Sequence, residues 1–219
     1  MKGLFVSGTD TDVGKTWVGT RLIQALSARG LTVSPRKPIE SGWPALAEDL
    51  PSTDTWKLAA AAGLAEQLDT ICPNRFPAPL SPVRAARMVD RSLTLDDITK
   101  QCMTDISSDD FIYVEGAGGF YSPLVEDGLN ADLASQLNLP IVLIANNKLG
   151  CISQVLLCCE AMEKRNLDLR AIILNQVTPV TESTAMNNQE DIAEYVTQPV
   201  FSLHHAQDNL PAPLIDLLY

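Results

Sequence analysis

Short apolar stretches alternate along the chain with longer stretches of helical character. The apolar stretches are GLFVS from Gly3, LTVSPRK from Leu31, FIYVE from Phe111, PIVLIA from Pro140 and LRAIILN from Leu169. Nearly continuous apolar strands are typical of parallel sheets that are covered on both faces. Their alternation with helices therefore predicts a doubly wound, mostly parallel α/β sheet with helices on both faces.

Five segments between these strands have the pattern of helices. They span residues 15–29, 53–62, 95–106, 152–165 and 188–196. Gly30 and Gly63 follow the first two and suit the ends of helices. The length of 219 residues predicts one domain over residues 1–219.

One proline-rich segment, residues 72–87, interrupts this alternation before a short Ala-Arg helix. A rigid, structured loop of this length in a compact domain often belongs to a functional site. Ordinary packing is the alternative for this segment.

Composition narrows the classes of protein to which the chain can belong. A net charge of −11 opposes binding to nucleic-acid phosphates, so we expect no nucleic-acid partner. The best apolar run, LPIVLIA from Leu139, is far shorter than the roughly 20 residues of a membrane span, so we expect no membrane association. The N-terminal segment has no secretory pattern, which predicts a cytoplasmic location.

The cysteines and histidines lack the pattern of a metal or disulfide site. The cysteines, an odd number without CxxC spacing, are Cys72, Cys102, Cys151, Cys158 and Cys159. Mostly apolar or helical surroundings suit reduced, buried thiols. His204 and His205 have no evident third ligand, so we interpret them as part of a surface loop.

The segment GTDTDVGKT, residues 8–16, predicts a phosphate-binding loop. Gly14, Lys15 and Thr16 supply the backbone N–H groups, the ammonium and the metal-binding hydroxyl that such a loop needs. The spacing is a variant, because Thr9 stands where the common form has its first glycine and Gly8 comes one residue early. Its position between a strand and a helix still predicts a nucleotide site.

Asp10 and Asp12 are unusual in a loop that holds phosphate. They would repel phosphate if they faced it. We therefore expect them to turn toward hydrogen bonds of the loop, the waters of a metal ion or a cationic second substrate such as a diamine. ATPases that partition DNA resemble KGGVGKT here, with a second lysine aligned to Asp10, so this chain has the opposite charge at that position.

Six motifs together resemble the dethiobiotin synthetases, a family of ATP-dependent carboxylases. The motifs are GTDTDVGKT at Gly8, KPIESG at Lys37, SPVRAA at Ser81, VEGAGGF at Val114, KLGCIS at Lys148 and LNQ at Leu174. They lie in the family's order and cover most of the chain. The resemblance implies a P-loop NTPase-type fold.

The resemblance also implies a reaction. In that reaction, 7,8-diaminononanoate takes up CO2, supplied by bicarbonate, as a carbamate, and ATP phosphorylates the carbamate. The neighbouring amine then closes the ring, releasing ADP and phosphate. No biotin or nicotinamide is implied.

Lys37 and Lys15 are the candidate catalytic residues. Pro38 disfavours helix at the residue before it and keeps Lys37 extended, so that its ammonium can reach toward the loop. Alone, Lys37 could be a solvated lysine at the end of a strand. The resemblance of KPIESG to the family's catalytic segment implies instead that Lys37 and Lys15 neutralise charge on the carbamate and the transferred phosphoryl group.

Glu115 follows an apolar strand and precedes the flexible GAGG, so its carboxylate lies where ligands bind to an open α/β sheet. With the Thr16 hydroxyl and Asp54, it is predicted to hold Mg²⁺ as the cofactor. Asp54 could instead be a carboxylate that stabilises a helix N-terminus. Asp49 is a competing ligand.

Further ATP contacts are predicted along the motifs. The residues are Asp12, Val13, Trp17, Gly116, Ala117, Gly118, Asn175, Gln176, Pro199, Val200 and Phe201. The resemblance implies that Asn175 reads the adenine edge, although it could simply cap a turn. The QPVFSLHH segment departs from the family's usual glycine-and-proline ending.

The resemblance implies a substrate site that is shared by two subunits. Its candidates are Thr11, Ser41, Ser81, Gly150, Cys151 and Ser153. Ser153 stands where the family often has asparagine. The apolar VLLCCEAM that follows it predicts a homodimer interface, with packing inside one chain as the alternative.

Two other functions remain open from the sequence. One is a nucleotide-switched partition or positioning ATPase, against which the charge of Asp10 and the acidic composition count. The other is a cobyrinate-type amide ligase, whose usual glutamine-hydrolysing domain would not fit in this length.

Overall fold

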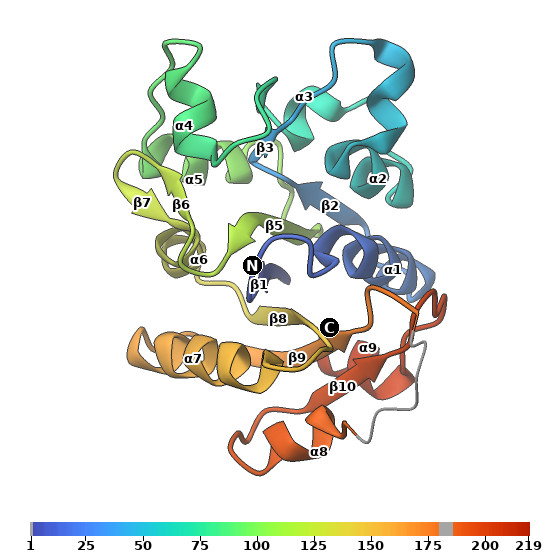
Figure 1. The fold of residues 1–219 in the computed structure, drawn as a ribbon. Coiled ribbons are helices and arrows are strands. Elements are labelled where there is room, and N and C mark those ends of the chain that lie inside the picture. The colour runs from blue at the N-terminus through green and yellow to red at the C-terminus, as the bar shows by residue number, and fades with distance from the viewer. Residues whose placement is uncertain (1, 180–185) are drawn as a thin grey trace.

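A parallel sheet of six strands lies at the centre of the computed structural model, which describes residues 2–179 and 186–219 (Figure 1). In spatial order the strands are β10 (Val200–Leu203), β9 (Leu169–Asn175), β8 (Ile141–Asn146), β1 (Lys2–Gly8), β5 (Phe111–Gly119) and β2 (Val33–Arg36). Neighbouring strands are parallel throughout. The prediction of a mostly parallel α/β sheet is therefore confirmed, and all five predicted strands are present.

Helices cover both faces of this sheet because side chains alternate along each strand. Leu4 and Val6 of β1 pack in one cluster with α1 (Lys15–Ala28), α2 (Asp54–Ala61) and α9 (Ala212–Leu217). Phe5, between them, packs in the opposite cluster. That cluster includes α4 (Pro82–Arg87), α5 (Leu95–Met103), α6 (Asn130–Leu137), α7 (Cys151–Lys164) and α8 (Asn188–Ala193).

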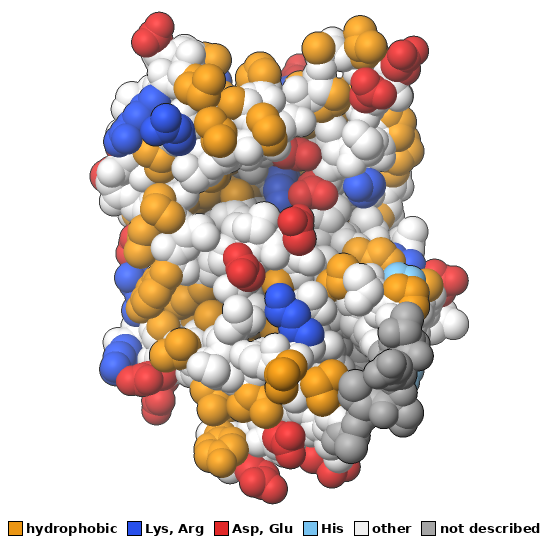
Figure 2. All heavy atoms as spheres, viewed as in Figure 1, with side chains coloured by type: hydrophobic (Ala, Val, Ile, Leu, Met, Phe, Trp, Pro, Cys, Tyr) orange, Lys and Arg blue, Asp and Glu red, His pale blue; other side chains and the backbone are white. Residues whose placement is uncertain are grey.

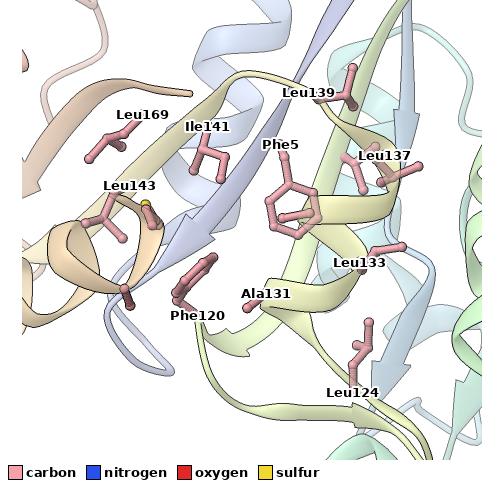
Figure 3. Close-up of a cluster of buried hydrophobic side chains, with 14 of the residues drawn as sticks. Phe5, Phe120, Leu124, Ala131, Leu133, Leu137, Leu139, Ile141, Leu143 and Leu169 are labelled. Atoms are coloured by element: carbon pink, nitrogen blue, oxygen red, sulfur yellow. The ribbon is translucent and has the colours of Figure 1, made fainter. Parts of the chain in front are cut away.

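The second cluster shows how one helix is held on the sheet (Figure 3). Ala131, Leu133 and Leu137 of α6 lie in the same cluster as Phe5 and Ile141 of the strands. Phe5 and Ile141 are fully buried. Truncating a buried phenylalanine to alanine costs about 3–5 kcal/mol, so this contact is a substantial part of the stability.

The remaining elements are short. They are β3 (Ile39–Ser41), the 3-10 helix η1 (Ala47–Ser52), α3 (Leu68–Ile71), β4 (Asn74–Phe76), β6 (Pro123–Val125) and β7 (Gly128–Leu129). β3 pairs with β4, and β6 with β7, beside the main sheet. Among the described residues, none of the helices has the length and apolar character of a membrane span.

Several predicted boundaries differ from the structure. The helix predicted over 95–106 ends at Met103, and the one over 188–196 ends at Ala193. The sequence interpretation missed α9 and several short elements, and also α6 and β10, which lie next to the site. α6 carries polar residues between its apolar ones, and β10 is short, so neither gives the long apolar signal used for the other elements.

Candidate active site

The loop between β1 and α1 wraps around the ammonium of Lys15. Gly14 has a left-handed backbone with φ of 87°, and α1 begins directly after it. The Nζ of Lys15 donates to the carbonyl of Asp10 at 2.9 Å and is almost fully buried. The loop thus folds around the Lys15 ammonium, which would contact phosphate, and the N-terminus of α1 follows the loop directly.

The two loop aspartates are both exposed. Asp10 Oδ1 accepts from the backbone N–H of Thr11 at 2.7 Å, which is a hydrogen bond within the loop. Asp12 adopts a left-handed backbone with φ of 56°. The structure thus directs the Asp10 carboxylate onto the loop itself, one of the orientations expected from the sequence.

An ionic cluster that is buried except at Asp54, whose side chain is 41% exposed, lies beside this loop. Lys37 Nζ is 2.6 Å from Glu115 Oε1 and 3.3 Å from Asp54 Oδ2. The Thr16 hydroxyl donates to the same Oε1 of Glu115 at 2.7 Å. The three predicted metal ligands therefore meet the predicted catalytic residue Lys37 in one place. The competitor Asp49 lies exposed in η1.

Each member of the cluster comes from a different part of the carboxyl edge of the sheet. Thr16 is the second residue of α1, which follows β1. Lys37 follows β2, Glu115 is in β5 and Asp54 starts α2. In β5, Glu115 is paired in register with Val6 of β1. The fold thus brings together groups that are far apart in sequence, at the edge where open α/β sheets bind ligands.

Glu115 is completely buried, so its charge needs several partners. In addition to Lys37 and Thr16 on Oε1, the hydroxyl of Tyr113 donates to Oε2 at 3.1 Å. Gly19 of α1 makes room for that hydroxyl, because a Cβ there would lie 2.0 Å from it. Tyr113 is a site residue that the sequence interpretation missed, since a tyrosine inside an apolar strand looks like core.

The charges of the cluster shift one another's pKa values. Burial alone would lower the pKa of Lys37, but the attraction of Glu115 and Asp54 outweighs it, and the pKa is raised. For Asp54, desolvation opposes the charged form, yet Lys37 and Thr16 hold the pKa below its usual value. Burial and the nearby charge of Lys37 lower the pKa of Lys15 to about 8.

The lowered pKa of Lys15 has a measurable consequence. Between pH 8 and the ordinary value of 10.5, the folded protein has lost a proton that the unfolded chain keeps, so the contribution of Lys15 to stability rises with pH. Bound phosphates would favour the ammonium and return this proton. If bound phosphate returns the pKa of Lys15 from about 8 to its ordinary value, nucleotide binding should take up roughly 0.1 proton at pH 7 and roughly 0.9 proton at pH 9.

Calorimetric titration with Mg-ADP, in buffers of different ionisation enthalpy, measures this proton uptake. The apparent heat should depend on the buffer at pH 8.5 and depend less on it at pH 7. A heat that is independent of the buffer at both pH values would show that Lys15 stays fully protonated without nucleotide.

The oxygen donors of the cluster fit Mg²⁺. Magnesium prefers oxygen ligands and in phosphate sites is held by one or two carboxylates together with phosphates and water. Thr16, Asp54 and Glu115 offer one hydroxyl and two carboxylates. In the described part of the chain, no group of three or more His, Cys, Asp or Glu side chains is arranged to hold a metal ion. Nucleotide phosphates would therefore have to complete the coordination.

The GAGG segment after Glu115 is held by one buried amide. Asn130 Oδ1 accepts from the N–H of Ala117 at 3.0 Å, and its Nδ2 donates to the carbonyls of Ala117 at 2.6 Å and Gly119 at 3.0 Å. Gly116 has to be small, because a Cβ there would lie 2.7 Å from Asn130 Oδ1. The predicted ATP contacts Gly116, Ala117 and Gly118 thus have a fixed backbone.

Asn175 lies at the end of β9 against the phosphate-binding loop. Its Nδ2 donates to the carbonyl of Val13 at 3.0 Å, and the side chain is nearly buried. Gln176 follows it and donates its N–H to the carbonyl of Leu203. The end of β9 is thus tied to both the loop and β10.

The predicted base contacts at Pro199, Val200 and Phe201 do not all reach this edge. Val200 is paired in register with Ile172, near the middle of β9, whereas Leu203 is paired with Asn175. Pro199 therefore lies toward the opposite end of the sheet. The residues that follow Leu203 occupy the edge near Asn175, and reading PVFSL as a strand would have indicated this.

The loop after β10 is held to α1 through Arg21. Its guanidinium donates to the Gln207 carbonyl at 3.2 Å and to Asp208 Oδ1 at 2.9 Å. It also stacks on Trp17 at 3.6 Å from the ring centre. Trp17, a predicted ATP contact, thus packs under a cation that secures the loop beside Asn175.

The candidate substrate residues fall into two groups. Ser41 ends β3, and the next residue, Gly42, donates to the Ala78 carbonyl at 3.2 Å, which places Ser41 beside the segment that leads to Ser81. Ser81 precedes α4, and Thr11 lies exposed in the phosphate-binding loop. Gly150, Cys151 and Ser153 lie at the start of α7, after β8.

The fold and this site define a class of protein, the P-loop nucleotide-binding proteins. Two solved structures share the fold, although their identities are too low to indicate more. A nucleotide-binding protein in complex with ADP from Archaeoglobus fulgidus is 10% identical, with a TM-score of 0.55 over 99% of this chain and 85% of that one. A ParA family ATPase from Chlorobium tepidum TLS is 18% identical, with a TM-score of 0.54 over 95% and 86%.

Sequence relatives identify the family. A profile of the family described as AAA domain matches residues 2–203. The ATP-dependent dethiobiotin synthetase BioD of Vesicomyosocius okutanii is 37% identical over 89% of this chain and 86% of the relative. That of Anaeromyxobacter sp. (strain Fw109-5) is 38% identical over 95% and 92%. The chain belongs to the family of ATP-dependent dethiobiotin synthetases.

Proposed function

We propose that the chain forms dethiobiotin from 7,8-diaminononanoate, CO2 and ATP. It is a carbon–nitrogen ligase, as its family is. The observation that carries the proposal is the meeting of Lys37, Glu115 and Thr16 beside the buried ammonium of Lys15. This equipment suits phosphoryl transfer to a negatively charged acceptor.

The two lysines stabilise the charge that develops in the reaction. The substrate amine takes up CO2 and forms a carbamate. A carbamate oxygen attacks the terminal phosphorus of ATP, the bond to ADP breaks, and the second amine then attacks the carbonyl and expels phosphate. Lys15 neutralises the nucleotide phosphates, while Lys37 faces the acceptor, so their charges are fixed before the reaction begins.

The carboxylates position Lys37 and complete a Mg²⁺ site with the nucleotide. Glu115 and Asp54 lie 2.6 and 3.3 Å from the Lys37 ammonium, and Thr16 supplies a hydroxyl. Mg²⁺ bound there would neutralise charge on the β- and γ-phosphates. The attraction of these carboxylates also keeps Lys37 charged throughout the pH range of the assay.

Steady-state ADP formation tests the proposed function. ADP should form only when both 7,8-diaminononanoate and bicarbonate are present with Mg-ATP. A nucleotide-switched partition ATPase, the alternative that shares this fold, would hydrolyse ATP without them and respond to DNA or to a protein partner. The curated relatives do not favour that alternative.

We also propose a homodimer, built on the outer surface of α7. Leu149 and Leu157 are 88% and 63% exposed, and Tyr195 beyond α8 is 70% exposed. A groove of about 780 Å³ between α7 and α8 includes Gly150 and Ser153 in its lining. Hydrophobic side chains also appear along this part of the surface in Figure 2. If a second copy covered this face, the start of α7 would contact the substrate that is bound in the partner subunit.

Sedimentation at micromolar concentration should give about twice the 23.7 kDa of one chain. Leu157→Glu should shift the protein toward monomer, because it places a charge in the apolar contact. Leu46→Glu is the matched control, since Leu46 is 57% exposed and lies before α2, at the far edge of the sheet from α7. A monomer from the unchanged chain would contradict the proposal.

A cytoplasmic location fits the thiols. All five cysteines are free, and three of them are buried. Free thiols persist in a reducing compartment.

A further inference from the structure

Glu40 joins the segment that carries Lys37 to the first turn of α2. Its Oε1 accepts from the backbone N–H of Asp54 at 2.8 Å. Its Oε2 accepts from the N–H and from the hydroxyl of Thr55, at 2.9 and 2.5 Å. Both carboxylate oxygens of a residue in β3 are therefore used to hold the start of another element.

The start of α2 already has a cap of its own. The Thr53 side chain accepts from the N–H of Trp56 at 3.1 Å, and the Thr53 carbonyl accepts from Lys57. Without Glu40, the N–H groups of Asp54 and Thr55 would be left for water. Glu40 thus accepts hydrogen bonds from the backbone of Asp54, whose side chain faces Lys37, and from the backbone of Thr55.

We propose that Glu40 is a positioning residue for Asp54 in the metal and nucleotide site. It lies three residues after Lys37 and one before Ser41, so the same clamp ties the lysine, the substrate segment and the Asp54 carboxylate into one unit. Asp54 then meets the metal-bound nucleotide from a fixed position. This inference rests on the proposed function, because it takes Asp54 as a ligand of that metal.

The Mg²⁺ requirement of ADP binding tests this role. Glu40→Gln keeps the size but replaces one acceptor oxygen with an NH2 group that cannot accept. The Mg²⁺ concentration that gives half-maximal ADP affinity, measured by calorimetry, should rise about five- to tenfold, as expected for the loss of one or two hydrogen bonds. Amide exchange at Asp54 and Thr55 should also become faster.

Asp127→Asn is the matched control. Asp127 Oδ1 accepts from the N–H of Leu95 at 2.8 Å, so it also caps a helix from a distant segment, but at α5. Its melting temperature should fall, because the negative charge at the N-terminus of α5 is lost even where the amide oxygen still accepts from Leu95. The Mg²⁺ requirement should stay unchanged. Thr55→Val, which removes only the hydroxyl donor to Glu40, should raise the requirement by about twofold.

The same measurements can overturn the inference. If Glu40→Gln and Asp127→Asn lower the melting temperature alike and neither changes the Mg²⁺ requirement, Glu40 only caps α2. If Glu40→Gln does not fold, Thr55→Val takes its place in the test. An unchanged Mg²⁺ requirement in Thr55→Val would then show that Glu40 only caps α2. Because the titration detects metal and nucleotide rather than product, its result is separate from whether the chain forms dethiobiotin.

Discussion

Lys37→Gln should lower the rate of ring closure by about 10²- to 10³-fold and leave most of the affinity for Mg-ADP. The reason is the position of Lys37, whose ammonium is buried beside Glu115 and would face the acceptor rather than the nucleotide alone. Negative charge moves onto the acceptor as the reaction proceeds, so the missing charge matters most in the transition state. Single-turnover formation of product measures the effect.

The stability of this variant needs a control. Removing one partner of a buried ion pair costs about 3–5 kcal/mol, although the amide of glutamine can still donate to Glu115. Ile98→Ala, at a fully buried position of α5, should cost about 2–5 kcal/mol and leave the rate unchanged. If Lys37→Gln folds and forms product as fast as Ile98→Ala, Lys37 does not take part in catalysis.

Lys15→Ala should reduce ADP formation by at least about 10³-fold. Lys15 is the buried cation inside the phosphate-binding loop, and its side chain touches the loop carbonyl of Asp10 rather than the hydrophobic core. The substitution therefore removes charge from the phosphates without opening an apolar cavity. It should also abolish the uptake of a proton on nucleotide binding.

The control for Lys15→Ala is Lys100→Ala, which removes the same charge from the exposed surface of α5. Lys100 pairs with Asp96 there, and its side chain is 72% exposed. This variant should keep its turnover, since an exposed ion pair contributes little. If Lys15→Ala kept the turnover of Lys100→Ala, the loop would not bind the transferred phosphate.

The strands and the phosphate-binding loop could be predicted from the sequence because their signals are local. Buried parallel strands are apolar over their whole length, and Gly14, Lys15 and Thr16 stand next to one another. The approach of Lys37 to Glu115 is different, since it depends on β2 and β5 being neighbours in the sheet. The residues themselves indicated that Lys37 reaches toward the loop and that Glu115 lies at the ligand-binding edge, but no local signal indicated their direct contact.

Residues that act through a hydrogen bond to a distant segment could not be found in this way. Glu40 looks like a polar residue in a short motif, and Asn130 lies in a stretch for which the sequence predicts no element. Their roles depend on backbone groups of Asp54 and Ala117, whose positions follow from tertiary packing. The register of β10 is a similar case, because it places Pro199 away from the end of β9 that carries Asn175.

The central claim is that the chain builds a cyclic urea from a diamine and CO2. The most direct measurement is incubation of the protein with Mg-ATP, carbon-13 bicarbonate and 7,8-diaminononanoate, followed by mass spectrometry of the product. The account predicts dethiobiotin with one labelled carbon, in the ureido ring, and one ADP for each ring formed. The account would be contradicted by ADP release that gives no labelled ring and whose rate does not depend on the diamine or on bicarbonate.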